Sequence, residues 1–158
     1  MTEEKRLYSS CDIINAIDTY MEENNICGAE LSVKCGYHDD WYNEIKRKMH
    51  RGIRPNIFNI EYILSCIGKG LMVTIELDNE TVVVPINDIY KTMEEIRQKK
   101  HLKKVNIAVK GKLNSCKYDR IIRADKNDGF LSMLKDKFMD GVAEAMGYKY
   151  FYTLRDLG

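Results

Sequence analysis

Few residues of this 158-residue chain have the types and spacing that catalysis needs. Cys35 precedes His38 by three residues, a spacing from which a thiolate–imidazole nucleophile could be built. The two residues flank a predicted turn in a packed motif, where a buried structural thiol is the more common arrangement. The chain contains no glycine-rich phosphate loop, no GxSxG motif and no HExxH motif. We therefore predict that the protein is not an enzyme and requires no cofactor.

The same residue types could also hold a metal ion. Cys27, Cys35 and His38 are the candidate zinc ligands, but their spacing matches no standard pair of zinc-binding residues. The five cysteines include no CxxC pair. We therefore expect no metal site, and free thiols, which are the usual state in a reducing cytosol.

Four short amphipathic helices are predicted for roughly the first 70 residues. Ser9 or Ser10 can cap the first helix, and Asp39 or Asp40 can cap the third. Gly36 fits the end of the second helix because glycine accepts a positive φ. The four segments are 11–24, 28–37, 38–52 and 56–70, the last with Asn56 as its cap.

The segment from Asp12 to Gly68 resembles the lambda-repressor-like (Cro-type, XRE) helix-turn-helix family. The stretch that carries the resemblance is NNICGAELSVKCGYHDDWYNEIKRKMHRGIRPNIFNIEYILSCIG. Leu31 matches a core residue of the family's second helix, Gly36 the turn that follows it, and Ile45 the buried position of the recognition helix. The resemblance implies a helical bundle whose recognition helix enters the major groove of DNA, and dimers that bind pseudo-palindromic sites.

Polar and basic side chains in and around the third helix are the candidates for DNA contact. Asparagine suits adenine, and arginine or lysine suits guanine. The candidates for base or groove contacts are Trp41, Tyr42, Asn43, Lys46 and Arg47, and the candidates for phosphate contacts are Lys34, Lys48, Arg51 and Arg54. The alternative is that Trp41 packs in the core while the basic residues form a solvated helix face.

From Leu71 onward the apolar spacing becomes that of strands. Two β-branched runs flank Asp78 and Asn79, which predicts a hairpin, and Pro85 fits the end of an edge strand. The next predicted elements are a helix over 87–99, strands over 103–113 and 118–124, a helix over 130–146 and a terminal strand over 148–154. This order predicts an α+β fold with a mainly antiparallel sheet. We expect a helix-turn-helix bundle over residues 1–69 and an α+β domain for dimerisation or partner binding over residues 70–158.

The C-terminal part of the chain is basic, with fourteen Lys and Arg against seven Asp and Glu in residues 99–158. Its lysines could bind nucleic acid or an acidic partner protein, or could protect an edge strand from aggregation. Tyrosines alternate in the terminal strand, which is typical of an interface or of a strand packed on its sheet. The candidate partner-binding residues are Lys110, Lys112, Tyr148, Tyr150 and Tyr152.

The whole chain carries 25 Lys and Arg against 24 Asp and Glu, so any contact with DNA must be local. The first residues lack the layout of a signal peptide, and no window approaches the roughly 20 apolar residues of a membrane span. We expect a soluble cytoplasmic protein, without a membrane partner.

Two functions from different classes follow from these patterns. The first is a DNA-binding transcriptional regulator that binds double-stranded DNA as a homodimer. The alternative is a phage or mobile-element inhibitor, similar in layout to anti-CRISPR proteins. Its α+β domain would block a partner protein, and its helical domain would regulate its own gene.

Overall fold

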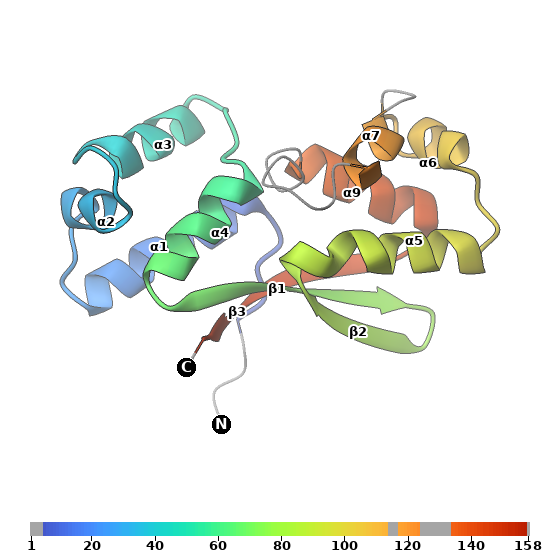
Figure 1. Ribbon diagram of the computed structural model, residues 1–158, viewed down its shortest axis with the longest axis horizontal. Coiled ribbons are helices and arrows are strands. Elements are labelled where there is room, and N and C mark those ends of the chain that lie inside the picture. The colour runs from blue at the N-terminus through green and yellow to red at the C-terminus, as the bar shows by residue number, and fades with distance from the viewer. Residues whose placement is uncertain (1–4, 114–116, 124–133, 158) are drawn as a thin grey trace.

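In the computed structural model, which describes residues 5–113, 117–123 and 134–157, four helices precede the first strand. They are α1 (Ser10–Glu23), α2 (Gly28–Lys34), α3 (Trp41–His50) and α4 (Ile57–Cys66). Figure 1 shows them gathered at one end of the molecule. The four predicted helices are confirmed.

Three local signals place the ends of these helices. Ser9 caps α1 because its hydroxyl accepts a hydrogen bond from the backbone N–H of Asp12 at 3.2 Å. Asn56 caps α4 by accepting one from the N–H of Asn59 at 2.8 Å. Gly36 follows the C-cap of α2 with φ of +82°, a conformation that costs glycine little. The predictions at Ser9, Asn56 and Gly36 are confirmed.

The sheet has three antiparallel strands in the order β2-β1-β3. Their bounds are Lys69–Leu77 for β1, Glu80–Pro85 for β2 and Lys149–Asp156 for β3. β1 and β2 form the predicted hairpin, with Asp78 at φ of +53° in its turn. The backbone of Leu7 exchanges two hydrogen bonds with that of Tyr152. Residues before α1 thereby extend the sheet on the other side of β3.

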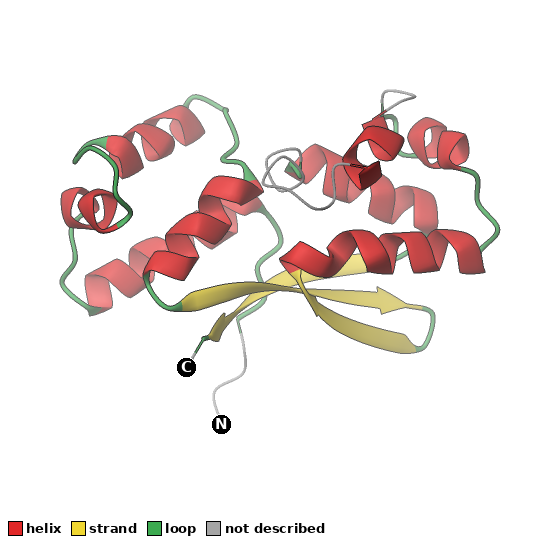
Figure 2. Cartoon of the chain, viewed as in Figure 1, coloured by secondary structure: helices red, strands yellow, loops and turns green. Residues whose placement is uncertain are grey.

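After β2 the chain forms a 3-10 turn, η1 (Ile86–Asp88), and then further helices. These are α5 (Ile89–Lys99), α6 (Lys104–Lys110), α7 (Lys117–Arg123) and α9 (Asp136–Met146). α5 confirms the helix predicted over 87–99, and α9 lies within the helix predicted over 130–146, whose residues 130–133 are outside the described residues. In Figure 2 the helices lie above the sheet, α1 and α4 over one end and α5 and α9 over the other.

The two strands predicted over 103–113 and 118–124 are wrong, because α6 and α7 occupy these segments as far as the structure describes them. A strand would have placed Val105, Ile107 and Val109 on one face. Instead Ile107 is buried while Val105 and Val109 are 53% and 71% exposed. α6 packs on α9 so closely that a Cβ on Gly111 would lie 2.5 Å from the carbonyl oxygen of Gly141. The segment therefore packs as a helix on α9 and does not join the sheet.

One hydrophobic core runs through both parts of the chain. Its buried residues include Ile17 of α1, Ile60 of α4, Val73 of β1, Met139 of α9 and Tyr152 of β3. The boundary predicted between residues 69 and 70 falls at the start of β1. The helical part and the sheet part therefore share a core across that boundary. Among the described helices, none has the length and apolarity that a bilayer crossing needs.

Candidate functional site

The buried side of α3 is fixed to α1 and α2. The side chain of Tyr42 is 1% exposed, and its hydroxyl donates a hydrogen bond to Asp18 of α1 at 2.7 Å. The backbone N–H of Tyr42 donates to the hydroxyl of Ser32 on α2 at 2.9 Å. Burial raises the pKa of Tyr42 far above its ordinary value, and the adjacent Asp18 carboxylate adds to the rise. These two bonds set the orientation of α3.

The prediction that Tyr42 contacts DNA is therefore wrong, because a tyrosine enclosed by α1 and α2 presents no atoms to a groove. Lys46 lies one turn further along α3, and its Nζ atom is 2.9 Å from Asp18 Oδ2. Its side chain is one-third exposed. Asp18 thus accepts a hydrogen bond from Tyr42 and forms an ion pair with Lys46. The ion pair keeps the charge of Lys46 on the side of α3 that faces α1.

Two further predicted contact residues lie at the start of α3. Trp41 is partly buried and stacks on Tyr37, with ring centroids 4.1 Å apart and planes inclined by 12°. Asn43 is exposed, but its amide lies against the first turn of α2, where a Cβ on Gly28 would be 2.5 Å from Asn43 Oδ1. Trp41 therefore matches the packed alternative in part, and Asn43 faces the neighbouring helix.

The outward face of α3 carries Arg47, Lys48 and Arg51, which adjacent turns bring to the same side. Arg47 donates to the carboxylate of Asp40, and this contact holds the pKa of Asp40 below its usual range. Asp40 stands at the N-cap position but makes no capping hydrogen bond, so its predicted role as a cap is wrong. The exposed side chains of Lys48, Arg51 and Lys34, the last residue of α2, have no hydrogen-bond or ion-pair partner among the described residues. We call these three the unpaired cations.

A groove lies beside the C-terminal end of α3. It has a volume of about 220 Å³ and runs between the loop that joins α3 to α4 and the start of α9. We call it the loop groove. It contains three cations, two amides and an apolar wall; its lining is Lys48, Arg54, Lys135, Asn56, Asn59, Ile45, Ile53 and Pro55.

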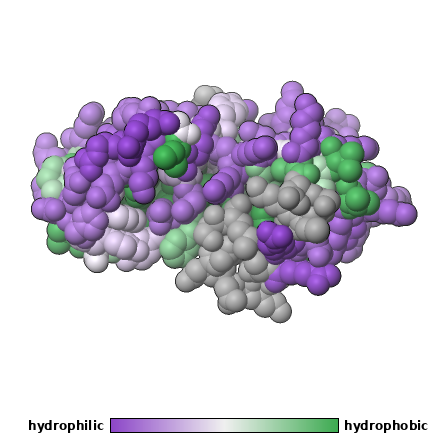
Figure 3. Space-filling view, turned by 90° about the horizontal axis from the view of Figure 1, so that it is seen from above, coloured by the Kyte–Doolittle hydropathy of each residue, from purple (hydrophilic) through white to green (hydrophobic). Residues whose placement is uncertain are grey.

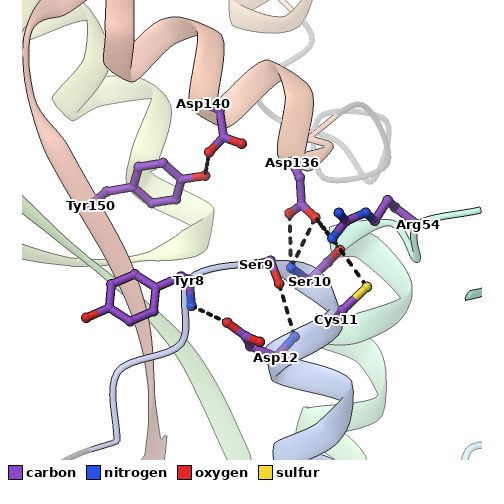
Figure 4. A network of polar contacts seen from close by, with 9 residues as sticks. All are labelled: Tyr8, Ser9, Ser10, Cys11, Asp12, Arg54, Asp136, Asp140 and Tyr150. Carbon is purple, nitrogen blue, oxygen red and sulfur yellow. Dashed lines mark hydrogen bonds and ion pairs between the residues drawn. The ribbon is translucent and has the colours of Figure 1, made fainter. Parts of the chain in front are cut away.

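Arg54 joins this groove to a network of polar contacts at the start of α9. Its guanidinium lies 3.3 Å from Asp136 Oδ2 and 3.4 Å from Cys11 Sγ. Asp136 also accepts hydrogen bonds from the backbone N–H of Ser10 at 3.0 Å and from its hydroxyl at 2.7 Å. Figure 4 shows these side chains converging from α1, the α3–α4 loop and α9. Arg54, a predicted phosphate contact, is thus exposed but partly neutralised.

The surface above α3 is largely hydrophilic. In the space-filling view of Figure 3, seen from above, hydrophilic side chains cover most of the end of the molecule that holds α1–α4. Small hydrophobic areas lie within this surface and at its edge. This composition fits a surface that contacts water or a polar partner, and it does not fit a large apolar interface.

The residues predicted to bind a partner protein divide into two groups. Lys110 and Lys112 are exposed at the end of α6 and just beyond it. Tyr148 and Tyr152 are 6% and 0% exposed, and the hydroxyl of Tyr150 donates to Asp140 of α9 at 2.6 Å. The prediction that Tyr148 and Tyr152 contact a partner is therefore wrong, because both side chains pack beneath the helices. Their alternation in the sequence reflects the packing of the terminal strand onto its sheet.

The cysteines and histidines do not form the catalytic pair considered from the sequence. Cys35 is 2% exposed beside Cys66, and burial raises the pKa of its thiol to about 12. His38 is exposed, with Nε2 3.7 Å from Glu44 Oε2. In the part of the chain that the structure describes, no three His, Cys, Asp or Glu side chains gather as a metal site would need, and the four cysteines there are free thiols. Cys116 is outside that part.

Sequence reasoning missed Lys135 and Asn59, which line the loop groove. Lys135 is far from α3 in the chain, and no local pattern connects the two. The sequence contains one weak indication of Asn59, because this residue lies in the first turn of a helix that Asn56 caps.

No protein-family model matches this chain, and no curated protein or solved structure matches it. The function of the protein is therefore inferred from the shape and charge of its own surface.

Proposed function

We propose that the protein binds double-stranded DNA through the outward face of α3 and acts as a transcriptional regulator. The observation that carries the proposal is the set of unpaired cations, Lys34, Lys48 and Arg51. Exposed lysine and arginine side chains that form no ion pair can neutralise phosphates and release the counterions bound to DNA. That release is the main source of affinity for such proteins.

The dimensions of α3 support the same function. Its ten residues span about 15 Å, and a helix with its side chains is about 10–12 Å across, which the major groove of B-DNA accepts. Tyr42 fixes the buried side to α1 and α2, and Lys46 adds a bond to Asp18. A helix already held in one orientation loses little further entropy on binding.

The charges along α3 favour contact through its C-terminal half. Asp39, Asp40 and Glu44 lie at or near the first turn, where carboxylates repel phosphate. Lys48 and Arg51 lie at the other end. We infer a docking mode in which the last turn of α3 approaches the DNA backbone most closely. The proposal includes a cytoplasmic homodimer on a pseudo-palindromic site, the arrangement that the family resemblance implies.

The test is fluorescence anisotropy with labelled duplexes, one carrying the DNA that flanks the protein's own gene and one of unrelated sequence, over a series of salt concentrations. The double variant Lys48→Ala/Arg51→Ala removes two unpaired cations. We expect its affinity to fall at least tenfold and the salt slope to flatten by about 2, since each lost phosphate contact is worth about 0.9.

The control is Lys91→Ala/Lys99→Ala, which removes the same charge from two exposed positions of α5, one of them paired with Glu80 at 3.8 Å. It should bind like the wild-type protein. Equal losses in both double variants, or no salt-dependent binding by the wild type, would overturn the proposal.

One observation favours the second function, inhibition of a partner protein. Val105 and Val109 are exposed on α6, and Lys110 and Lys112 lie beside them, which makes a small apolar patch with a basic rim. Such a patch fits a protein with an acidic border around an apolar centre. If this function holds, Val105→Ser/Val109→Ser abolishes inhibition while the affinity for DNA stays unchanged.

A further inference from the structure

The loop groove is the most strongly cationic concave surface among the described pockets. Lys48 reaches it from α3, Arg54 from the α3–α4 loop and Lys135 from the N-cap of α9. No carboxylate stands among its lining residues. Lys48 and Lys135 form no ion pair among the described residues, whereas Arg54 is shared with Asp136. Positive charges gathered around one depression attract an anion more strongly than separate surface lysines do.

A neighbouring pocket has cations as well, but it also has acidic residues. It has a volume of about 420 Å³, shares Arg54 with the loop groove, and includes Lys112 and Lys137. Three acidic residues line it as well: Asp136, Asp140 and Glu144. The two pockets have the same number of cations, so the acidic residues make the difference. Of these two pockets, the loop groove is the one suited to an anion.

The backbone beside Lys135 is held by contacts of the next residue. Asp136, the next residue, is 12% exposed and accepts two hydrogen bonds from Ser10, which is itself 1% exposed. Arg54 approaches the same carboxylate (Figure 4). The start of α9 is therefore tied to α1 and to the α3–α4 loop, which carry the two sides of the groove.

We propose that the loop groove holds a backbone phosphate of the DNA that α3 contacts, so that α9, in the C-terminal part of the chain, supplies part of the DNA interface. The inference rests on the proposed DNA binding. Lys48 belongs both to the outward face of α3 and to the groove, which makes the two surfaces continuous. Exposed Ile53 in the wall of the groove would lie against the deoxyribose next to the phosphate.

The experiment compares Lys135→Gln with Lys137→Gln. The two lysines are exposed and lie two residues apart, but Lys137 lines the pocket that also holds Asp140 and Glu144. Binding to the same labelled duplexes is measured at several salt concentrations. We expect Lys135→Gln to weaken binding three- to tenfold and to flatten the salt slope by about 0.9, the value of one phosphate contact, and Lys137→Gln to change neither.

Thermal unfolding of both variants checks that the fold is intact. If Lys135→Gln binds like the wild type while Lys48→Ala/Arg51→Ala binds weakly, the groove carries no phosphate and the proposed function stands. If Lys137→Gln weakens binding as much as Lys135→Gln does, the effect comes from overall charge and the inference fails. If the wild type binds no DNA, both proposals fail.

Discussion

Arg47 reaches back along α3 to the carboxylate of Asp40, so an arginine of the outward face is held by an acid at the start of the same helix. Both side chains are about half exposed. The contact therefore lies at the surface, where it is weak and another anion can compete for the guanidinium. The closely spaced phosphates of DNA can supply such an anion.

Replacing Asp40 with asparagine should strengthen DNA binding. The change removes one negative charge near the backbone and releases Arg47 for a phosphate, so we expect affinity to rise two- to fivefold and the salt slope to steepen by about 0.9. Fluorescence anisotropy measures both. Asp39→Asn is the control, since it removes the same charge without releasing an arginine; an equal change in slope for both variants would contradict this role of Arg47.

Tyr42→Phe separates stability from DNA binding. The variant loses only the hydroxyl that donates to the Asp18 carboxylate, so the free energy of unfolding should fall by about 1.5–3 kcal/mol, the usual value of a hydrogen bond to a charged group. The affinity for DNA should not change, because the side chain is buried. Urea denaturation measures the free energy of unfolding, and fluorescence anisotropy measures the affinity for DNA. A large loss of affinity with unchanged stability would restore Tyr42 as a contact residue.

Asp136→Ala should destabilise the whole molecule by about 1–3 kcal/mol, because it leaves the N–H and hydroxyl of the buried Ser10 without their acceptor. Trp41, the sole tryptophan, reports on the helical part by fluorescence, and circular dichroism reports on all the helices.

In the wild type, the tryptophan fluorescence and the circular dichroism should change at the same urea concentration, because one core joins the helical part to the sheet part. Two separate transitions in the wild type would argue against a shared core.

Gly111→Ala should be strongly destabilising. The new Cβ would lie 2.5 Å from the carbonyl oxygen of Gly141, which is backbone and cannot turn aside. Moving α6 away from α9 costs about 1–3 kcal/mol, as overpacking usually does. Val109→Ala, on the exposed side of α6, should change stability by less than about 0.5 kcal/mol. Similar melting temperatures for the two variants would show that α6 and α9 are not in close contact.

Glu61→Gln tests a pH dependence. Burial raises the pKa of Glu61 above its ordinary value of 4.5, although the N–H of Leu71, which donates to its carboxylate at 3.3 Å, opposes the shift. The folded chain therefore binds the proton more tightly than the unfolded chain, and this contribution to stability is present at low pH and lost as pH rises through the folded pKa. The variant should gain stability relative to the wild type at pH 7, and the gain should shrink as pH falls toward 4.5. Urea denaturation at several pH values measures it, and a constant difference would contradict the shift.

The elements with local end signals were predictable from the sequence. Ser9, Asn56, Gly36 and Asp78 each fix a cap or a turn through their own side chain or backbone, and the structure places them accordingly. α6 and α7 have seven residues each, too few to distinguish a helical from an alternating pattern. α6 also packs on α9 through Gly111 and Gly141, a contact between residues that are distant in the chain and that no local pattern indicates.

The candidate site was predictable only as a set of cations. Lys34, Lys48 and Arg51 are exposed, as residues of a DNA interface must be. Tyr42 was misplaced because neighbouring residues on a helix point about 100° apart, so an error of one position exchanges a surface residue for a core residue. Lys135 could not be found, because tertiary packing alone brings α9 to the end of α3.

The position of β3 has a consequence for synthesis of the protein. A ribosome releases α1–α4 and the β1–β2 hairpin well before it makes Lys149–Asp156. Until then one edge of β1 has no partner, and Leu7 lacks the backbone of Tyr152. A nascent chain therefore exposes an unpaired strand and apolar surface from the completion of β1 until β3 is made, the condition in which chains aggregate or bind chaperones. Products of premature termination before β3 should accordingly be targets of cellular proteolysis.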